Sequence, residues 1–201
     1  MSELKVLQAV RLKGRVTPTD LAATLGEDPR RVAATIAELT AVGLLIEGKM
    51  LRISPDGRER LNMLLAQERS GTDTAAITAA YHDFRVVNTD FKALVSDWQL
   101  KDGVPNTHGD AHYDAAVLHR LDGIHKRVVP IIAAAARQVP RLSAYSDKLA
   151  AALEKVKAGE TIWLTRPTVD SYHTVWFEQH EELILAAGLT RDGEAKAGRA
   201  Q

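Results

Sequence analysis

Helix-starting and helix-ending residues follow one another closely in the first 55 residues of this 201-residue chain. Thr17-Pro18 and Asp28-Pro29 each combine a capping side chain with a proline, a pair that favours the first turn of a helix. Gly26 and Gly43 stand where the helical spacing of apolar residues stops, as glycines often do at helix ends. A segment interrupted this often can form only short helices joined by tight turns.

The apolar residues between these interruptions predict the order of the elements. Their spacing predicts a helix over 4–12, a second over 18–25 and a third whose buried side would carry Val32, Ile36 and Leu39. Two helices joined by a few residues that include a glycine form a helix-turn-helix. Short apolar runs on either side of Glu47-Gly48-Lys49 then predict a small hairpin.

Three segments of this region, TPTDLAATLG, DPRRVAATIAELTAVGLL and LRISPDGRERL, carry a family resemblance. In the order of their expected elements and in the residues that start and end them, residues 1–69 resemble the winged helix-turn-helix domain of MarR-type bacterial transcriptional regulators. The resemblance implies a domain of helices with a small β-hairpin that binds double-stranded DNA. Because a single domain with so small a net positive charge would bind DNA weakly, a homodimer that reads a two-fold site is expected.

The third helix supplies the residues expected to read base edges. If its apolar stripe faces the core, four residues turn mostly outward: Arg30, Arg31, Ala34 and Thr35. Arginine can bind guanine or phosphate with two hydrogen bonds, and alanine or threonine can contact a thymine methyl group. The alternative is that Arg30 and Arg31 are solvated residues of a first turn. Basic side chains there oppose the helix dipole, so helix stability does not explain them.

The resemblance also implies contacts with the DNA backbone. It assigns Lys49 and Arg52 of the hairpin to phosphates, and it makes the hydroxyls of Thr17 and Thr19 phosphate donors.

A polar stretch at 67–74 separates this region from a second one of different composition. Every Trp, Tyr and Phe of the chain lies at or beyond Tyr81. Apolar stripes predict four helices between 74 and 190, over about 74–101, 113–131, 142–156 and 169–187, and short connections favour an antiparallel four-helix bundle. This bundle would sense an effector or dimerise. Residues 191–201 are expected to form a flexible tail. The fold class is therefore mainly α, a winged helix followed by an all-α bundle.

All seven histidines lie in the second region. His173, Trp176 and His180 fall on the apolar side of the last helix, and His125 follows Leu121 by one helical turn, so these four residues are candidates for a ligand pocket. Histidines buried there would be hydrogen-bonded structural residues, part of a small-molecule site, or ligands of a metal. Residues seven apart are separated by ~10.5 Å along a helix, so His173 and His180 do not easily share one ion.

Several classes of function lack their usual residues. The chain has no cysteine, which excludes disulfides, thiolate zinc sites and cysteine nucleophiles. Glycine-rich phosphate loops and nucleophile elbows are also missing. Glu178, Glu181 and Glu182 could form an acid–base cluster, but such clusters are usually a solvated helix face. We therefore expect no enzyme, no catalytic residue and no cofactor, and leave a metal or a small-molecule effector open.

The N-terminus has charges scattered among its apolar positions, unlike a signal peptide, and no apolar stretch approaches a membrane span, so a cytoplasmic protein is expected. The segment SYHTVWFEQHEELILAAGLTRDGEA is similar to helical segments appended to phosphoenolpyruvate-utilising enzymes of actinobacteria, which implies a portable regulatory or interaction module. The main expectation is a DNA-binding transcriptional regulator. The alternatives are an adaptor that docks on a partner enzyme through the winged helix, and a small helical enzyme.

Overall fold

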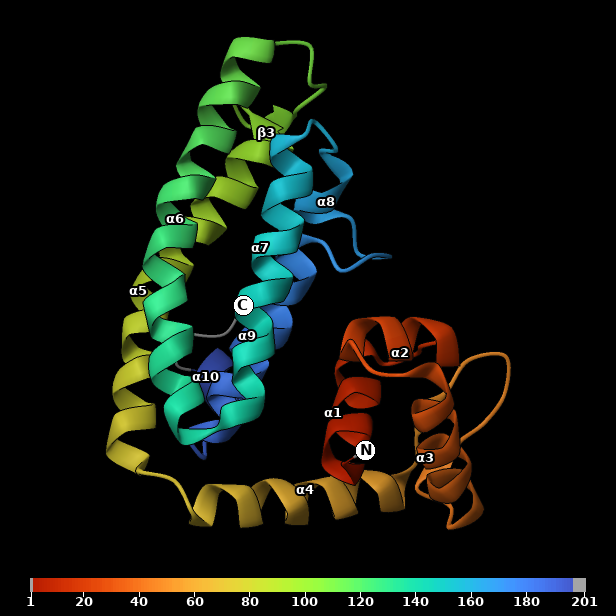
Figure 1. Cartoon of the computed structure of the whole chain (residues 1–201). Coiled ribbons are helices and arrows are strands. Elements are labelled where there is room, and N and C mark those ends of the chain that lie inside the picture. Colours follow the sequence, from red (N-terminus) through yellow and green to blue (C-terminus); the bar gives the residue numbers. More distant parts are fainter. Residues whose placement is uncertain (1, 197–201) are drawn as a thin grey trace. The chain divides into compact units, whose positions relative to one another are not determined.

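The computed structural model describes residues 2–196 and is mainly helical, as the sequence predicts (Figure 1). The chain divides into two compact units, Met1–Gly71 and Thr72–Gln201, and each is described by itself. None of the helices among residues 2–196 is long and apolar enough to cross a membrane.

The first unit contains four helices and one small hairpin. Its elements in order are α1 (Glu3–Lys13), α2 (Pro18–Leu25), α3 (Pro29–Ala41), β1 (Leu45–Ile46), β2 (Arg52–Ile53) and α4 (Pro55–Ser70). The two strands pair antiparallel, with Leu45 opposite Ile53. An antiparallel bridge between Val16 and Leu51 adds the segment before α2 to this hairpin.

The capping residues expected at α2 and α3 are confirmed. The Thr17 hydroxyl accepts a hydrogen bond from the Asp20 backbone N–H at 3.1 Å. The Asp28 carboxylate accepts from the backbone N–H groups of Arg30 and Arg31 at 2.9 and 3.1 Å. Gly26 ends α2 with φ of 63°, a conformation that glycine adopts without the strain of a Cβ atom. The helix boundaries of this unit therefore follow from its local sequence.

The hairpin is attached to the start of α4 through one backbone carbonyl, that of Leu44. The backbone N–H and the hydroxyl of Ser54 both donate to this oxygen, each at 3.1 Å, and the same hydroxyl accepts from the Gly57 N–H at 2.9 Å. A Cβ atom at Gly57 would stand only 2.1 Å from the Leu44 oxygen. Position 57 therefore accepts no side chain, which gives a physical reason for the Ser-Pro-Asp-Gly sequence here.

The core of the first unit is aliphatic. Val6, Leu7, Leu21, Leu51 and Leu61 are buried at its centre, with exposed fractions of 1% or less. Their burial packs α1 against α2, α3 and α4 and under the hairpin. No aromatic side chain contributes, because this part of the sequence has none.

The second unit contains the four long helices expected from the apolar stripes. They are α5 (Thr74–Gln99), α6 (Ala111–Gln138), α7 (Ala144–Lys157) and α9 (Tyr172–Ala186). The helices α5 and α6 lie side by side as a long antiparallel pair (Figure 1), and α9 packs against α5 and α7. A 3-10 turn, η1 (Pro140–Ser143), joins α6 to α7, and a short helix, α8 (Ile162–Thr165), precedes α9.

Two segments of this unit differ from expectation. The connection between α5 and α6, expected to be a loop, contains a two-stranded antiparallel hairpin of β3 (Leu100–Lys101) and β4 (Val104–Pro105), so the unit is not purely α. The expected flexible tail begins with a helix, α10 (Arg191–Lys196), whose Glu194 is only 3% exposed and accepts a hydrogen bond from the Tyr81 hydroxyl at 2.7 Å. Residues 197–201 of that tail lie outside the described residues.

Aromatic side chains fill the centre of the second unit. Phe91 of α5 stacks on Trp176 of α9 with ring centroids 4.3 Å apart, and Phe84 and Tyr172 pack against the same indole at 5.1 and 6.0 Å. All four side chains are at most 2% exposed. Rings of this size hold α5 and α9 together over several turns.

Candidate functional sites

The start of α3 presents two unpaired cations. Arg30 and Arg31 follow the Asp28 cap directly, and both side chains are exposed, as is Ala34 one turn later. Among the described residues, neither guanidinium has an ion-pair or hydrogen-bond partner. The two arginines and Ala34 therefore lie where the sequence places them, on the open face of α3.

Thr35 does not belong to this face, and its prediction as an outward residue is wrong. It is only 8% exposed, and its hydroxyl donates to the Arg31 carbonyl oxygen at 3.1 Å. Position 35 borders the apolar stripe of Val32, Ile36 and Leu39. A small rotation of α3 about its axis therefore decides whether the side chain at position 35 is buried or exposed. A threonine hydroxyl can be buried here because the preceding turn of the helix supplies its acceptor.

The residues expected to contact phosphates have mixed surroundings. Thr19, Lys49 and Arg52 are exposed on α2, on the loop between the strands and on β2. Thr17 is half-buried, and its hydroxyl proton is donated to the Asp20 carboxylate at 2.7 Å. Because that proton is already used within the α2 cap, Thr17 is a helix cap in this structure and not a free hydroxyl donor.

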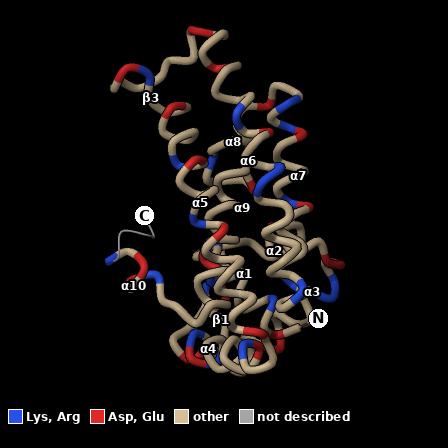
Figure 2. Tube along the Cα trace, turned by 90° about the vertical axis from the view of Figure 1, so that its left-hand side faces the viewer, with Lys and Arg blue, Asp and Glu red and all other residues tan. Residues whose placement is uncertain are grey.

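Charges of both signs are distributed along each unit rather than gathered in one segment (Figure 2). The whole chain carries 26 basic and 26 acidic residues, so no strong overall field favours a polyanion. An interaction with DNA would therefore depend on the few exposed cations of α3 and the hairpin.

The second unit contains a cavity of about 250 Å³ between α5 and α9. Three of the four residues predicted for a ligand pocket line it, namely His173, Trp176 and His180. Positions 173, 176 and 180 lie on one side of a helix, so the apolar side of α9 that the sequence predicts is the side that faces α5.

Two contacts fix the shape of this cavity. The Trp176 indole N–H donates to the Asn88 side-chain oxygen at 2.9 Å, which orients both side chains. The Phe91 ring stacks on the same indole and lies 5.9 Å from the His173 imidazole. Asn88 and Phe91 were missed from the sequence because they belong to α5. Their spacing of three residues puts both on the apolar side of α5, but this indicates a pocket only once α5 and α9 are known to pack together.

The imidazole of His180 is buried and neutral. It is 4% exposed, and its Nε2 has no hydrogen-bond partner among the described residues. Burial and the nearby Arg191 cation lower the pKa of His180 to about 4. Burial also lowers the pKa of His173. At pH 7 the cavity is therefore lined by uncharged imidazoles, each with one donor and one acceptor nitrogen.

His125, the fourth residue predicted for the pocket, lies elsewhere. Its Nδ1 is 3.2 Å from the Tyr172 hydroxyl, and it does not line the cavity between α5 and α9. Burial and the Lys157 cation lower the pKa of His125, while Asp122 is paired with Lys157 at 3.0 Å. Among the described residues, no group of three or more His, Asp or Glu side chains is placed to hold a metal ion.

The three glutamates of α9 are not the solvated face expected from the sequence. Glu178, Glu181 and Glu182 are at most 6% exposed. Arg141 pairs with Glu182 at 2.6 Å, Lys148 lies 3.9 Å from Glu178, and Arg191 pairs with Glu181. This burial could not be predicted from the helical spacing of α9, because the partner cations come from η1, α7 and α10. Buried ion pairs of this kind hold helices in register rather than act as free acids or bases.

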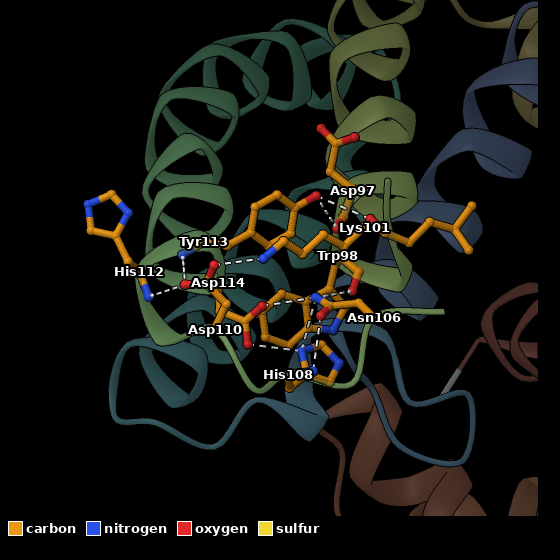
Figure 3. A network of polar contacts seen from close by, with 10 residues as sticks. Asp97, Trp98, Lys101, Asn106, His108, Asp110, His112, Tyr113 and Asp114 are labelled. Atoms are coloured by element: carbon orange, nitrogen blue, oxygen red, sulfur yellow. Dashed lines mark hydrogen bonds and ion pairs between the residues drawn. The ribbon is translucent and has the colours of Figure 1, made fainter. Parts of the chain in front are cut away.

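The connection between α5 and α6 is closed by a polar network (Figure 3). Lys101 pairs with Asp110 at 2.7 Å, which lowers the pKa of that carboxyl to about 2. Asp114 accepts from the Asn106 amide at 2.9 Å and lies 3.0 Å from the His108 Nδ1. These polar groups form hydrogen bonds and ion pairs with one another. The network therefore stabilises the connection at the end of the α5–α6 pair.

Comparisons with protein-family models, with curated proteins and with solved structures found no match for this chain.

Proposed function

We propose that the first unit is a winged helix that binds double-stranded DNA, and that the protein is a transcriptional regulator whose second unit binds an effector or dimerises. The observation that carries the proposal is the pair Arg30 and Arg31, exposed and unpaired at the start of α3. The helix dipole disfavours two cations there, so their position has a cost that DNA contact would offset.

The order of elements supports the same interpretation. A second helix of a helix-turn-helix presents the residues of its first turns to the major groove, and Arg30, Arg31 and Ala34 occupy those turns of α3. Lys49 and Arg52 are exposed on the adjoining hairpin, and in this proposal they contact phosphates. With so few cations, tight binding needs two copies on one site, so a homodimer is part of the proposal.

The test is fluorescence anisotropy with a library of genomic DNA fragments, titrated with salt. Affinity should fall steeply with salt, and some fragments should bind much more tightly than others. On such a fragment, Arg30→Ala and Arg31→Ala should each weaken binding by ~5- to 150-fold. Arg58→Ala is the matched control, because it removes an arginine that is also exposed but lies on α4, which the proposal does not place on DNA.

Exposed apolar side chains of the same unit favour a second candidate, a protein-interaction adaptor. Val42, Ile46 and Met50, after α3 and on the hairpin, are 68%, 40% and 42% exposed. Apolar side chains near a short hairpin suit a protein surface better than a phosphate backbone. Negligible binding to all fragments at low salt would contradict the regulator and favour this adaptor.

A further inference from the structure

The cavity between α5 and α9 is suited in size to one small ring system. Its volume of about 250 Å³ lies just below the range of ~300–1,000 Å³ that is common for sites of drug-sized ligands. It opens between the two helices and is lined by side chains of the second unit only. A molecule of one or two fused rings would fill it.

The apolar side of the cavity is aromatic. Phe91 and Trp176 are stacked on each other and are at most 2% exposed, so a ligand meets only their rim, and Phe177, 41% exposed, stands at the outer side. Surfaces of this kind bind planar molecules, because ring faces and edges attract one another beyond the burial of area. The wall therefore selects a planar ligand over an aliphatic one.

Except for Lys92, the polar groups of the cavity are uncharged, and they offer both donors and acceptors. The Asn88 oxygen is occupied by the Trp176 N–H, so the amide nitrogen is left as the donor for a ligand. His180 is only 4% exposed, yet its Nε2 has no hydrogen-bond partner among the described residues. An unpaired polar atom at such depth destabilises the protein, and a ligand that supplies a partner would remove this cost. The Nε2 atom is itself buried, so a ligand reaches it when the imidazole rotates, and a 180° turn exchanges the ring nitrogens without changing the outline of the ring.

The charges around the cavity argue against an ionic ligand. Among the described residues that line it, Lys92 is the single charged one, and its side chain is exposed to solvent. An exposed lysine gives only a weak, screened attraction to an anion, and it repels a cation. Recognition would therefore depend on neutral hydrogen bonds at the edge of a ring.

From this arrangement we propose that the cavity binds a neutral, planar nitrogen heterocycle of nucleobase size. The ring packs on Phe177 and against the rim of the stacked Phe91 and Trp176, and its edge exchanges hydrogen bonds with Asn88 and His180. The Asn88 amide nitrogen donates to an acceptor atom of the ring, and His180 can act as donor or acceptor. The binding site stands on the contacts of the second unit alone, and only its role as an effector site rests on the proposed function.

The test uses the full chain and four nucleosides as probes, adenosine, guanosine, cytidine and uridine, with benzoate as an aromatic anion for comparison. Isothermal calorimetry should detect at least one nucleoside, and that nucleoside should shift the indole N–H signal of Trp176 in a ¹⁵N–¹H spectrum. The signal is identified with Trp176→Phe. No DNA is present, so the outcome is independent of whether the first unit binds DNA.

Variants separate the proposed contacts from a general loss of structure. His180→Phe keeps a ring but removes both nitrogens, and it should weaken nucleoside binding at least ~10-fold, the effect of one lost hydrogen bond to a buried group. His125→Phe makes the same change outside the cavity and should leave binding within about twofold. Lys92→Ala should also leave it within about threefold, as expected for an exposed charge beside a neutral ligand.

Three results would overturn the proposal. The first is the absence of heat and of any Trp176 shift with every nucleoside. The second is binding of benzoate that Lys92→Ala removes, which would make the cavity an anion site. The third is an equal loss of nucleoside binding in His180→Phe and His125→Phe. If His180→Phe fails to fold, the Trp176 shift and the Lys92→Ala result still decide between a neutral ligand and an anion.

Discussion

The two units place their ionisable side chains differently. The first unit has an aliphatic core in which the buried polar side chains are uncharged, and Arg30, Arg31 and Arg52 are exposed on α3 and the hairpin. The second unit buries an imidazole, three carboxylates of α9 and several aromatic rings between helices. A surface cation is placed by the phase of its own helix, whereas each buried carboxylate of α9 is paired with a cation from another element. The candidate site of the first unit is therefore a row of exposed side chains, and that of the second lies between two packed helices.

The largest expected effect is on the first unit, at Gly57. Gly57→Ala would place a Cβ atom 2.1 Å from the Leu44 backbone oxygen, and neither the Cβ, whose position the backbone fixes, nor this carbonyl can rotate away. We expect a loss of ~3 kcal/mol or more in the free energy of unfolding, at the upper end of overpacking effects. Chemical denaturation followed by circular dichroism measures it.

Gly48→Ala is the matched control for this substitution. Its Cβ would meet nothing closer than the Met50 oxygen at 3.8 Å, so the stability should change by less than ~0.5 kcal/mol. Equal effects of the two substitutions would show that the close approach at Gly57 does not hold the hairpin on α4.

The second expected effect concerns the buried imidazole of the second unit. The pKa of His180 is about 4 in the folded protein, and a histidine in the unfolded chain titrates near ~6.5. The folded state therefore binds its proton less readily. The contribution of His180 to stability is complete above pH ~6.5 and is lost as the pH falls toward 4, by on the order of 3 kcal/mol.

Denaturation curves between pH 7 and pH 4.5 measure this slope. His180→Phe cannot be protonated and should flatten the curve, whereas His119→Phe, at an exposed position of α6, should leave it unchanged. A slope that persists in His180→Phe would assign the acid sensitivity to other groups, and the contrast between the exposed cations of the first unit and the buried imidazole of the second would lose its main support.

The smallest effect concerns the surface arginines. Arg31→Gln removes a cation from the first turn of α3, so it should raise the stability of the first unit by ~0.3–1 kcal/mol while weakening DNA binding. Arg52→Gln, on a strand without a helix dipole, should change stability by less than ~0.5 kcal/mol. If Arg31→Gln destabilised the unit, Arg31 would have a structural role and the argument for DNA would weaken.

Much of the fold could be predicted because its boundaries are local. Thr17, Asp28 and Ser54 cap their own helices, and the apolar stripes of α5, α6, α7 and α9 are continuous. The β3–β4 hairpin could not be predicted in the same way. It has only two residues in each strand. Its end is held by Asn106, whose backbone N–H donates to the Gln99 carbonyl and whose side-chain amide donates to Asp114 of α6.

The candidate sites could be predicted in part for the same reason. Helix phase was enough for Arg30 and Arg31 on α3, and for His173 and His180 on α9. It failed at Thr35, which lies at the border of a stripe, and at His125, whose partner Tyr172 belongs to another helix. The burial of Glu182 was also unpredictable, because its partner Arg141 lies 41 positions earlier in the sequence and outside any helical spacing.

The Leu44 carbonyl has a mechanical consequence. Since it accepts two hydrogen bonds from Ser54 and leaves no space at Gly57, the hairpin and the first turn of α4 must move as one rigid piece. The helix that follows has 16 residues, a lever arm of ~24 Å. A tilt of ~5° at the hairpin would displace Ser70 by ~2 Å, given the rise of an α-helix. A ligand that tilts the hairpin would thus displace the C-terminal end of α4, directly before the second unit begins.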